Sequence, residues 1–215
     1  MSGTRSVRLN NDTNFLKLIA IVSMLVDHMG ARIFPEYPIL RVIGRLAFPI
    51  FAYCIAVGCV YTRNIAKYAL RIGVLAILVQ PLYTTAMGHK AMGMFDWMHN
   101  FYRVDLIAQH YWYKPNILFS LLMGVLLIWS IRDKKYVATA VLALILWYVK
   151  SYLDYGIEGV ILMLLFYAFI DRPVASLVWV GLFMWYMGMP GFFTTFTLTP
   201  PRTQLYAMLA LPLIY

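Results

Sequence analysis

The stretch from Leu16 to Tyr61 holds two long apolar runs that are joined by a short turn at Phe34–Pro38. Each run has the roughly 20 apolar residues that a helix needs to cross a bilayer at ~1.5 Å rise per residue. The two runs therefore predict an antiparallel pair of membrane-spanning helices. Ionisable residues interrupt both runs: Asp27 and His28 in the first, and Arg45 in the second.

These ionisable residues lie at matching distances from the turn. His28 and Arg45 are equally far from its centre, which falls between Glu36 and Tyr37. In straight antiparallel helices they should therefore lie level with each other, roughly 10–13 Å below the nearer membrane surface. A charge at that depth is costly, so such residues usually face the bundle interior, find a partner and serve function. Because consecutive helical residues point about 100° apart, Asp27 and His28 should face different neighbours.

The rest of the chain fits a membrane protein. Of its 215 residues, 62% are hydrophobic and 13% are charged, whereas a soluble domain has about 25% charged residues. The apolar runs predict an all-α, polytopic transmembrane bundle of about eight helices, forming one domain over residues 1–215 with a polar tail over 1–13. The helices are expected near 14–34, 39–61, 68–87, 116–131, 136–152, 156–170, 174–189 and from 203. The last run is short for a span, so either its end lies at mid-membrane or the chain is truncated at its C-terminus.

Several other functions are disfavoured by the sequence. The net charge of +9 is explained by the positive-inside bias and by lipid head groups, so no nucleic-acid partner is expected. Cys54 and Cys59 lie inside an apolar run and predict no disulfide framework. His89, His99 and His110 do not have zinc-site spacing, and the aromatic residues around them are typical of an interfacial belt. No metal is expected.

Lysine and arginine are densest in two loops that fall on the same side of the predicted bundle. The residues of these loops are Arg63, Lys67 and Arg71, and Arg132, Lys134 and Lys135. The positive-inside rule places these loops, and with them the N-terminus, in the cytoplasm.

With this orientation, a set of polar residues gathers in the outer half of the bundle, as a site built between helices would. Its members are Asp27, His28, Arg45, Gln80, Asn116, Asp154 and Glu158. His28 is a candidate general base, because imidazole exchanges protons readily near neutral pH. Arg45 could hold Asp27, a phosphate or a developing oxyanion. The alternative is that Asp27 and Arg45 form a purely structural pair, and that Glu158 is a charge favoured at a helix start.

Five segments resemble motifs of the TraX family of conjugal-transfer membrane proteins, which is linked to N-acetylation of pilin. The resemblance begins with NFLKLIAIVSMLVDHMG at Asn14–Gly30 and LRVIGRLAFPIF at Leu40–Phe51. It continues with YTRNIAKYALR at Tyr61–Arg71, NILFSLLMG at Asn116–Gly124 and YGIEG at Tyr155–Gly159. The family is similar, more distantly, to membrane acyltransferases that use acetyl-CoA.

The resemblance implies an acetyltransferase in the bacterial inner membrane. Acetyl-CoA would enter from the cytoplasm, with its phosphates meeting Arg63, Lys67 and Arg71. His28 would act as general base on an amine or hydroxyl of a pilin N-terminus or a glycan at the outer face. The other implied catalytic residues are Asp27, Arg45 and Glu158, and the implied substrate-binding residues are Gln80, Asn116, Asp154 and Tyr155. The family's further C-terminal helix, with a Tyr- and His-containing motif, is not in this sequence.

Two other functions stay open. The same polar residues could form an Asp-His/Arg relay in a transporter or channel, although transporters usually show internal repeats and none is visible here. The chain could also be a non-enzymatic pilus assembly factor. Consumption of acetyl-CoA would separate the enzyme from both.

Overall fold

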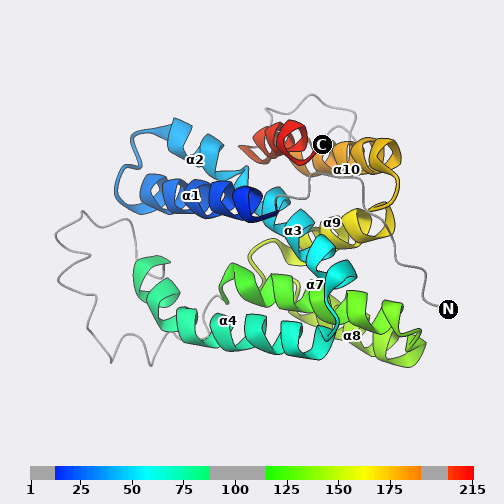
Figure 1. Ribbon diagram of the computed structural model, residues 1–215. Coiled ribbons are helices and arrows are strands. Elements are labelled where there is room, and N and C mark those ends of the chain that lie inside the picture. The colour runs from blue at the N-terminus through cyan, green and yellow to red at the C-terminus, as the bar shows by residue number, and fades with distance from the viewer. Residues whose placement is uncertain (1–12, 88–114, 190–202) are drawn as a thin grey trace. The chain divides into compact units, whose positions relative to one another are not determined.

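The computed structural model describes residues 13–87, 115–189 and 203–215 (Figure 1). These residues form helices and turns with no β-strand, which confirms the all-α prediction. If adjoining helices are taken together, the described ranges hold eight helical segments, as the apolar runs predict. Most of the polar tail and the segment with His89, His99 and His110 lie outside the described residues.

One compact unit combines the N-terminal hairpin with the C-terminal helices. Its elements are α1 (Thr13–Arg32), α2 (Pro38–Gly44), α3 (Ala47–Tyr61), the later part of α9 (Gly156–Ala168), α10 (Pro173–Gly188), the 3₁₀ helix η1 (Thr203–Ala210) and α12 (Leu211–Ile214). Helix α3 is buried over most of its length. Tyr53 of α3 packs edge-on against Phe166 of α9, with ring centroids 5.5 Å apart. This helix therefore forms the core of the unit.

The second predicted helix is interrupted. The sequence predicts one continuous helix from Ile39 to Tyr61, whereas the structure ends α2 at Gly44 and begins α3 at Ala47. Pro49 explains the interruption, because it has no N–H for the carbonyl of Arg45 and its ring clashes with that carbonyl in a continuous helix. The interruption places Arg45 at the C-terminal end of α2.

The other compact unit holds the middle of the chain. Its main elements are α4 (Ile65–Met87), α7 (Ile117–Arg132), α8 (Tyr136–Val149) and the first part of α9. Helix α4 packs against α7, which packs against α8. Helix α4 begins three residues earlier than predicted, because the side chain of Asn64 caps it: Oδ1 accepts the N–H of Lys67 at 2.9 Å. The prediction of a single domain over residues 1–215 stays a prediction.

Three of the described helices are long and apolar enough to cross a membrane. They cover Thr13–Arg32, Pro38–Tyr61 (α2 and α3 together) and Ile65–Thr84. The other apolar helices have 11 to 16 residues, fewer than the ~17–25 that a spanning helix usually needs. These lengths and the apolar surfaces fit a membrane protein.

Candidate functional site

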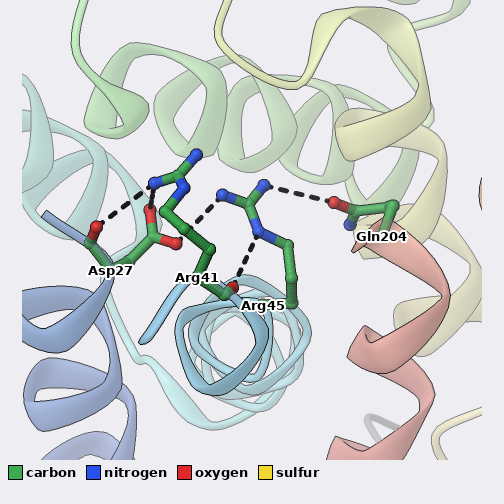
Figure 2. A network of polar contacts seen from close by, with 4 residues as sticks. All are labelled: Asp27, Arg41, Arg45 and Gln204. Carbon is green, nitrogen blue, oxygen red and sulfur yellow. Dashed lines mark hydrogen bonds and ion pairs between the residues drawn. The ribbon is translucent and has the colours of Figure 1, made fainter. Parts of the chain in front are cut away.

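Asp27 is held by two arginines from the following helix (Figure 2). Its Oδ2 atom lies 2.5 Å from Nη1 of Arg41, and its Oδ1 atom lies 3.0 Å from Nη2 of Arg45. Arg41 also donates to the backbone carbonyl of Asp27 at 3.2 Å. Both carboxylate oxygens are therefore committed to guanidinium groups. The predicted pairing of Asp27 with Arg45 is confirmed.

Arg45 connects this pair to the C-terminal helices. Its Nη1 atom donates to Oε1 of Gln204 at 3.5 Å, and its Nε atom donates to the carbonyl of Arg41 at 3.4 Å. Asp27, Arg41, Arg45 and Gln204 together form what we call the Asp27 site. The site thus joins α1, the end of α2, and η1.

The Asp27 site has more positive than negative charge. Only 12% of the Asp27 side chain and 14% of the Arg45 side chain are exposed, against 35% for Arg41. Within the described ranges, neither arginine contacts a second carboxylate. Two guanidinium groups thus share one carboxylate in a mostly buried setting, where electrostatic interactions are stronger than in water. Such a site favours a further anionic group or a developing negative charge nearby.

Two glycines allow α1 and α2 to approach closely enough for these contacts. A Cβ atom on Gly30 would lie 2.6 Å from Cβ of Leu40, and one on Gly44 would overlap the side chain of Asp27. The motif Gly44–Arg45 at the C-terminal end of α2 therefore places an arginine next to a residue without a side chain. This arrangement lets the carboxylate of Asp27 lie against the helix backbone.

We expect Gly44→Ala to destabilise the protein, because the new methyl group displaces Asp27 from the arginines. Overpacking of this kind costs about 1–3 kcal/mol. Gly73→Ala in α4 is the matched control, since its Cβ would lie 3.5 Å from Leu122, an ordinary contact. That change should be neutral or stabilising, by up to about 1 kcal/mol from helix propensity. Thermal unfolding in detergent measures both, and an equal effect of the two changes would contradict the close packing at Gly44.

His28 follows Asp27 on α1 and is half-buried. Helix geometry directs the two side chains about 100° apart, so the imidazole points away from the direction in which Asp27 meets its arginines. Because both oxygens of Asp27 bind guanidinium groups, this carboxylate is not the partner that would orient the imidazole. The level placement of His28 and Arg45 stays a prediction.

Gln80 and Asn116 form a second polar cluster, in the other unit. Oε1 of Gln80 accepts the backbone N–H of Asn116 at 2.9 Å and its side-chain amide at 2.8 Å. The same amide donates to the carbonyl of Ala76 at 2.8 Å, and Nε2 of Gln80 donates to Thr84 at 3.3 Å. Gln80, Thr84 and Asn116 are buried. We call this cluster the Gln80–Asn116 network.

The Gln80–Asn116 network has an evident structural role. Asn116 caps α7, since its Oδ1 atom accepts the N–H of Leu118 at 3.0 Å. Gln80 precedes Pro81, which lies inside α4 and lacks the N–H that a helix interior uses. The network therefore joins the start of α7 to the part of α4 where a proline disturbs the helix. Substrate binding by these two residues stays a prediction.

We expect Asn116→Ala to cost more stability than the loss of a helix cap alone. Losing the cap costs about 1 kcal/mol, and each buried polar group left unsatisfied costs a further ~1–3 kcal/mol. Asn64→Ala is the matched control, because Asn64 caps α4 in an exposed position. Asn64→Ala should cost only the stability that the helix cap contributes. Equal shifts of the unfolding temperature would show that the buried bonds of Asn116 contribute little.

The other predicted acidic residues lie around the start of α9. Asp154 is exposed, and Tyr155 and Glu158 are half-buried. Gly156 has a positive φ of 55°, and a Cβ atom there would lie 2.8 Å from Oε2 of Glu158. Glu158 thus folds back against the first residue of its own helix, the position in which helix N-termini favour an acid. Its catalytic role stays a prediction.

The predicted basic residues lie at the start of α4. Arg63, Lys67 and Arg71 are all exposed. Lys67 and Arg71 are four residues apart and share a helix face. Arg132, from the other dense basic loop, donates to the carbonyl of Thr62 at 3.4 Å. The two loops therefore meet, as expected if both lie on one side of a membrane.

The sequence indicates Asp27, Arg45, Gln80 and Asn116 as site residues but does not reveal some of their partners. Arg41 could have been found, because it lies four residues before Arg45 and thus on the same helix face. Gln204 and Thr84 carried no sequence signal. The polar residues that were expected at one depth belong partly to one unit and partly to the other. Their gathering into one site stays a prediction. Across residues 13–87, 115–189 and 203–215, no group of His, Cys, Asp and Glu side chains could hold a metal ion.

Comparisons with known proteins identify a family for this chain. A family model described as TraX protein matches residues 12–215. A probable fimbrial assembly protein FimC of Dichelobacter nodosus is 29% identical over 156 residues, covering 69% of this chain and 59% of the relative. An uncharacterized protein of Rickettsia prowazekii is 28% identical over 166 residues, covering 72% and 56%. Protein TraX of Escherichia coli is 26% identical over 156 residues, covering 72% and 54%.

The chain thus spans between 54% and 59% of the length of these relatives. No solved structure matches it. The family model covers nearly the whole chain, including α1 with Asp27 and His28, both arginines of α2, and the Gln80–Asn116 network. This protein belongs to the TraX family.

Proposed function

We propose that the protein is an integral-membrane acetyltransferase, which moves an acetyl group from cytoplasmic acetyl-CoA to an amine or hydroxyl at the outer face. The observation that supports this most is the Asp27 site beside His28. Both oxygens of Asp27 bind guanidinium groups. His28 is the next residue on α1, and its imidazole is suited to proton transfer near neutral pH.

In the proposed reaction, the acceptor nitrogen or oxygen attacks the carbonyl carbon of the thioester. His28 takes the proton that the acceptor loses as the new C–N or C–O bond forms. The C–S bond then breaks, and the CoA thiolate leaves and receives a proton. The products are the acetylated acceptor and free CoA, with no oxidant or reductant required.

Arg45 is suited to stabilising the oxyanion that develops in this reaction. Its guanidinium is mostly buried and belongs to a site with two positive groups and one negative group. Preorganised donors of this kind stabilise developing charge without reorganising during the reaction. Arg63, Lys67 and Arg71 are proposed to meet the phosphates of CoA, because their exposed charges lie together at the start of α4. Gln80, Asn116, Asp154 and Tyr155 are proposed to contact substrate, with Glu158 as a second acid.

The proposed acceptor is a pilin N-terminus or a glycan. One relative is named a probable fimbrial assembly protein, and another is named TraX. These names favour a role in building a surface fibre, and the sequence resemblance links the TraX family to pilin acetylation. We place the protein in the bacterial inner membrane with a cytoplasmic N-terminus.

A non-enzymatic assembly factor is the second candidate function. It is favoured by the name of the Dichelobacter nodosus relative, which specifies assembly rather than catalysis. Such a factor would hold its partner without using acetyl-CoA. Its contribution to fibre formation would survive a change of His28 that leaves the fold intact.

The test is transfer of label from acetyl-CoA to a membrane component. Membranes that contain the protein are incubated with acetyl-CoA labelled in its acetyl group, and the labelled product is identified by mass. Membranes with the His28→Gln variant at equal abundance are the control. The proposal expects label on an amine or hydroxyl in membranes with the parent protein and none in membranes with the variant. Equal labelling in both membranes, or none in either, would contradict it.

A further inference from the structure

We propose that α8 faces lipid acyl chains on all of its surface except the face that packs on α7, and that it thins the bilayer around it to a hydrocarbon thickness of about 21 Å. The first observation is exposure over most of the helix surface. Val137, Leu144 and Tyr148 are 80%, 70% and 82% exposed, and Leu146 is the buried residue of this 14-residue helix. The less exposed residues of α8 share one face, where Thr139 bonds Ser130 of α7, and the residues on the rest of its surface are exposed and apolar. A surrounding solvent of acyl chains covers such a helix, whereas a single partner helix covers one face.

The second observation is the length of α8 between charged residues. Lys135 precedes its first residue and Lys150 follows its last. Fourteen residues at ~1.5 Å rise give a helix about 21 Å long, whereas a typical hydrocarbon core is about 30 Å thick. Helix α7, which packs against α8, has 16 residues and ends at Arg132. Both helices of this hairpin are therefore too short for an undistorted bilayer.

The third observation is that aromatic and basic residues mark both ends of α8. Nζ of Lys150 lies 3.4 Å from the ring centroid of Trp147, and Nζ of Lys135 lies 5.6 Å from that of Trp129. Tryptophan, tyrosine and lysine favour the head-group region of a membrane. Since Lys150 is folded onto the ring of Trp147, it is not extended to reach a more distant head group. The two lysine–tryptophan pairs thus mark two interfaces about one helix length apart.

A tight turn fixes the hairpin of α7 and α8. The N–H of Lys135 donates to the carbonyl of Ser130 at 2.9 Å, and the hydroxyl of Thr139 donates to that of Ser130 at 2.9 Å. The turn therefore lengthens neither α7 nor α8. When a helix is too short to span a bilayer, the bilayer becomes thinner around it, long flanking side chains extend to the head groups, or the helix associates with other helices. Tilting would shorten the span further, and the exposed faces and the folded Lys150 favour thinning.

Spin-label depth measurements test this proposal. Val141→Cys on α8 and Val22→Cys on α1 form a matched pair, because both valines are half-exposed, at 50% and 52%, near the middle of their helices. The background is the full chain with Cys54 and Cys59 replaced by alanine, checked for an unchanged unfolding temperature. Each variant is spin-labelled in dioleoylphosphatidylcholine vesicles. The ratio of oxygen to nickel-chelate accessibility then reports the depth of the label.

The proposal expects the label at position 141 to lie about 10 Å deep and the label at position 22 about 15 Å deep, half of each helix length. Labels at Val137 and Tyr148 should be shallower than the label at 141. Lys150→Leu should deepen the α8 labels, whereas Lys150→Arg should not. Equal depths at 141 and 22 would overturn the proposal. It would also be overturned by uniform depth at 137, 141 and 148, which indicates a helix lying flat, or by shielding from both reagents, which indicates a protein partner.

Discussion

Asp27→Ala is expected to lower the free energy of unfolding by about 3–5 kcal/mol, because it leaves buried guanidinium charge without its carboxylate. Arg45→Ala should cost less than Asp27→Ala, because Asp27 keeps its ion pair with Arg41. Arg41→Ala should cost less, because a third of its side chain is exposed and water already screens its charge. Unfolding in detergent, followed by tryptophan fluorescence, measures all three.

A double-mutant cycle tests the pairing itself. Asp27→Ala combined with Arg45→Ala should recover part of the summed loss, because the guanidinium of Arg45 is then no longer buried without its carboxylate. The exposed pair of Asp133 and Lys135, 3.4 Å apart, is the control. Exposed pairs contribute about 0–1 kcal/mol, so its cycle should show little coupling. Simple additivity at Asp27 and Arg45 would mean that their contact adds nothing to stability.

His28→Gln is expected to lower the rate of acetyl transfer about 10²–10⁴-fold, the usual effect of losing a general base. Glutamine keeps polarity and approximate size but cannot take the proton. The unfolding temperature should change little, because the ion pairs of Asp27 remain. The acid limb of the parent's pH–rate profile should also disappear, because a general base must be unprotonated to act.

Near-normal turnover of the His28→Gln variant would remove His28 from the mechanism. Glu158 would then be the next residue to test, by Glu158→Gln. Asp133→Asn is a suitable control for unspecific effects of a charge change, because Asp133 lies in an exposed turn outside the proposed site. It should transfer acetyl at the parent rate.

The fold was largely predictable from the sequence, because long apolar runs bounded by polar turns determine where helices form in a membrane protein. The predicted first helix ends within two residues of α1. The break between α2 and α3 was missed, although Pro49 is visible in the sequence. Proline is tolerated in the first turn of a helix, so the sequence alone left open whether α3 begins there or continues from α2.

The candidate site was predictable only where its residues are close in sequence. Asp27 and Arg45 belong to one hairpin, and their distances from its turn indicate a similar depth in the membrane. Gln204 lies 159 residues from Arg45, and pairing over that separation depends on tertiary packing. Asn116 was expected as a substrate contact, and its hydrogen bonds to Gln80 and Ala76 show a tertiary role that the residue type alone did not reveal.

Use of acetyl-CoA by the purified, reconstituted protein distinguishes an acetyltransferase from a non-enzymatic assembly factor. Release of free CoA thiol is followed in vesicles to which an extract of host membrane components is added as acceptor. The acetyltransferase account predicts thiol release that requires the extract and is lost in the His28→Gln variant. If the folded parent releases no more thiol than that variant does, the central claim is contradicted.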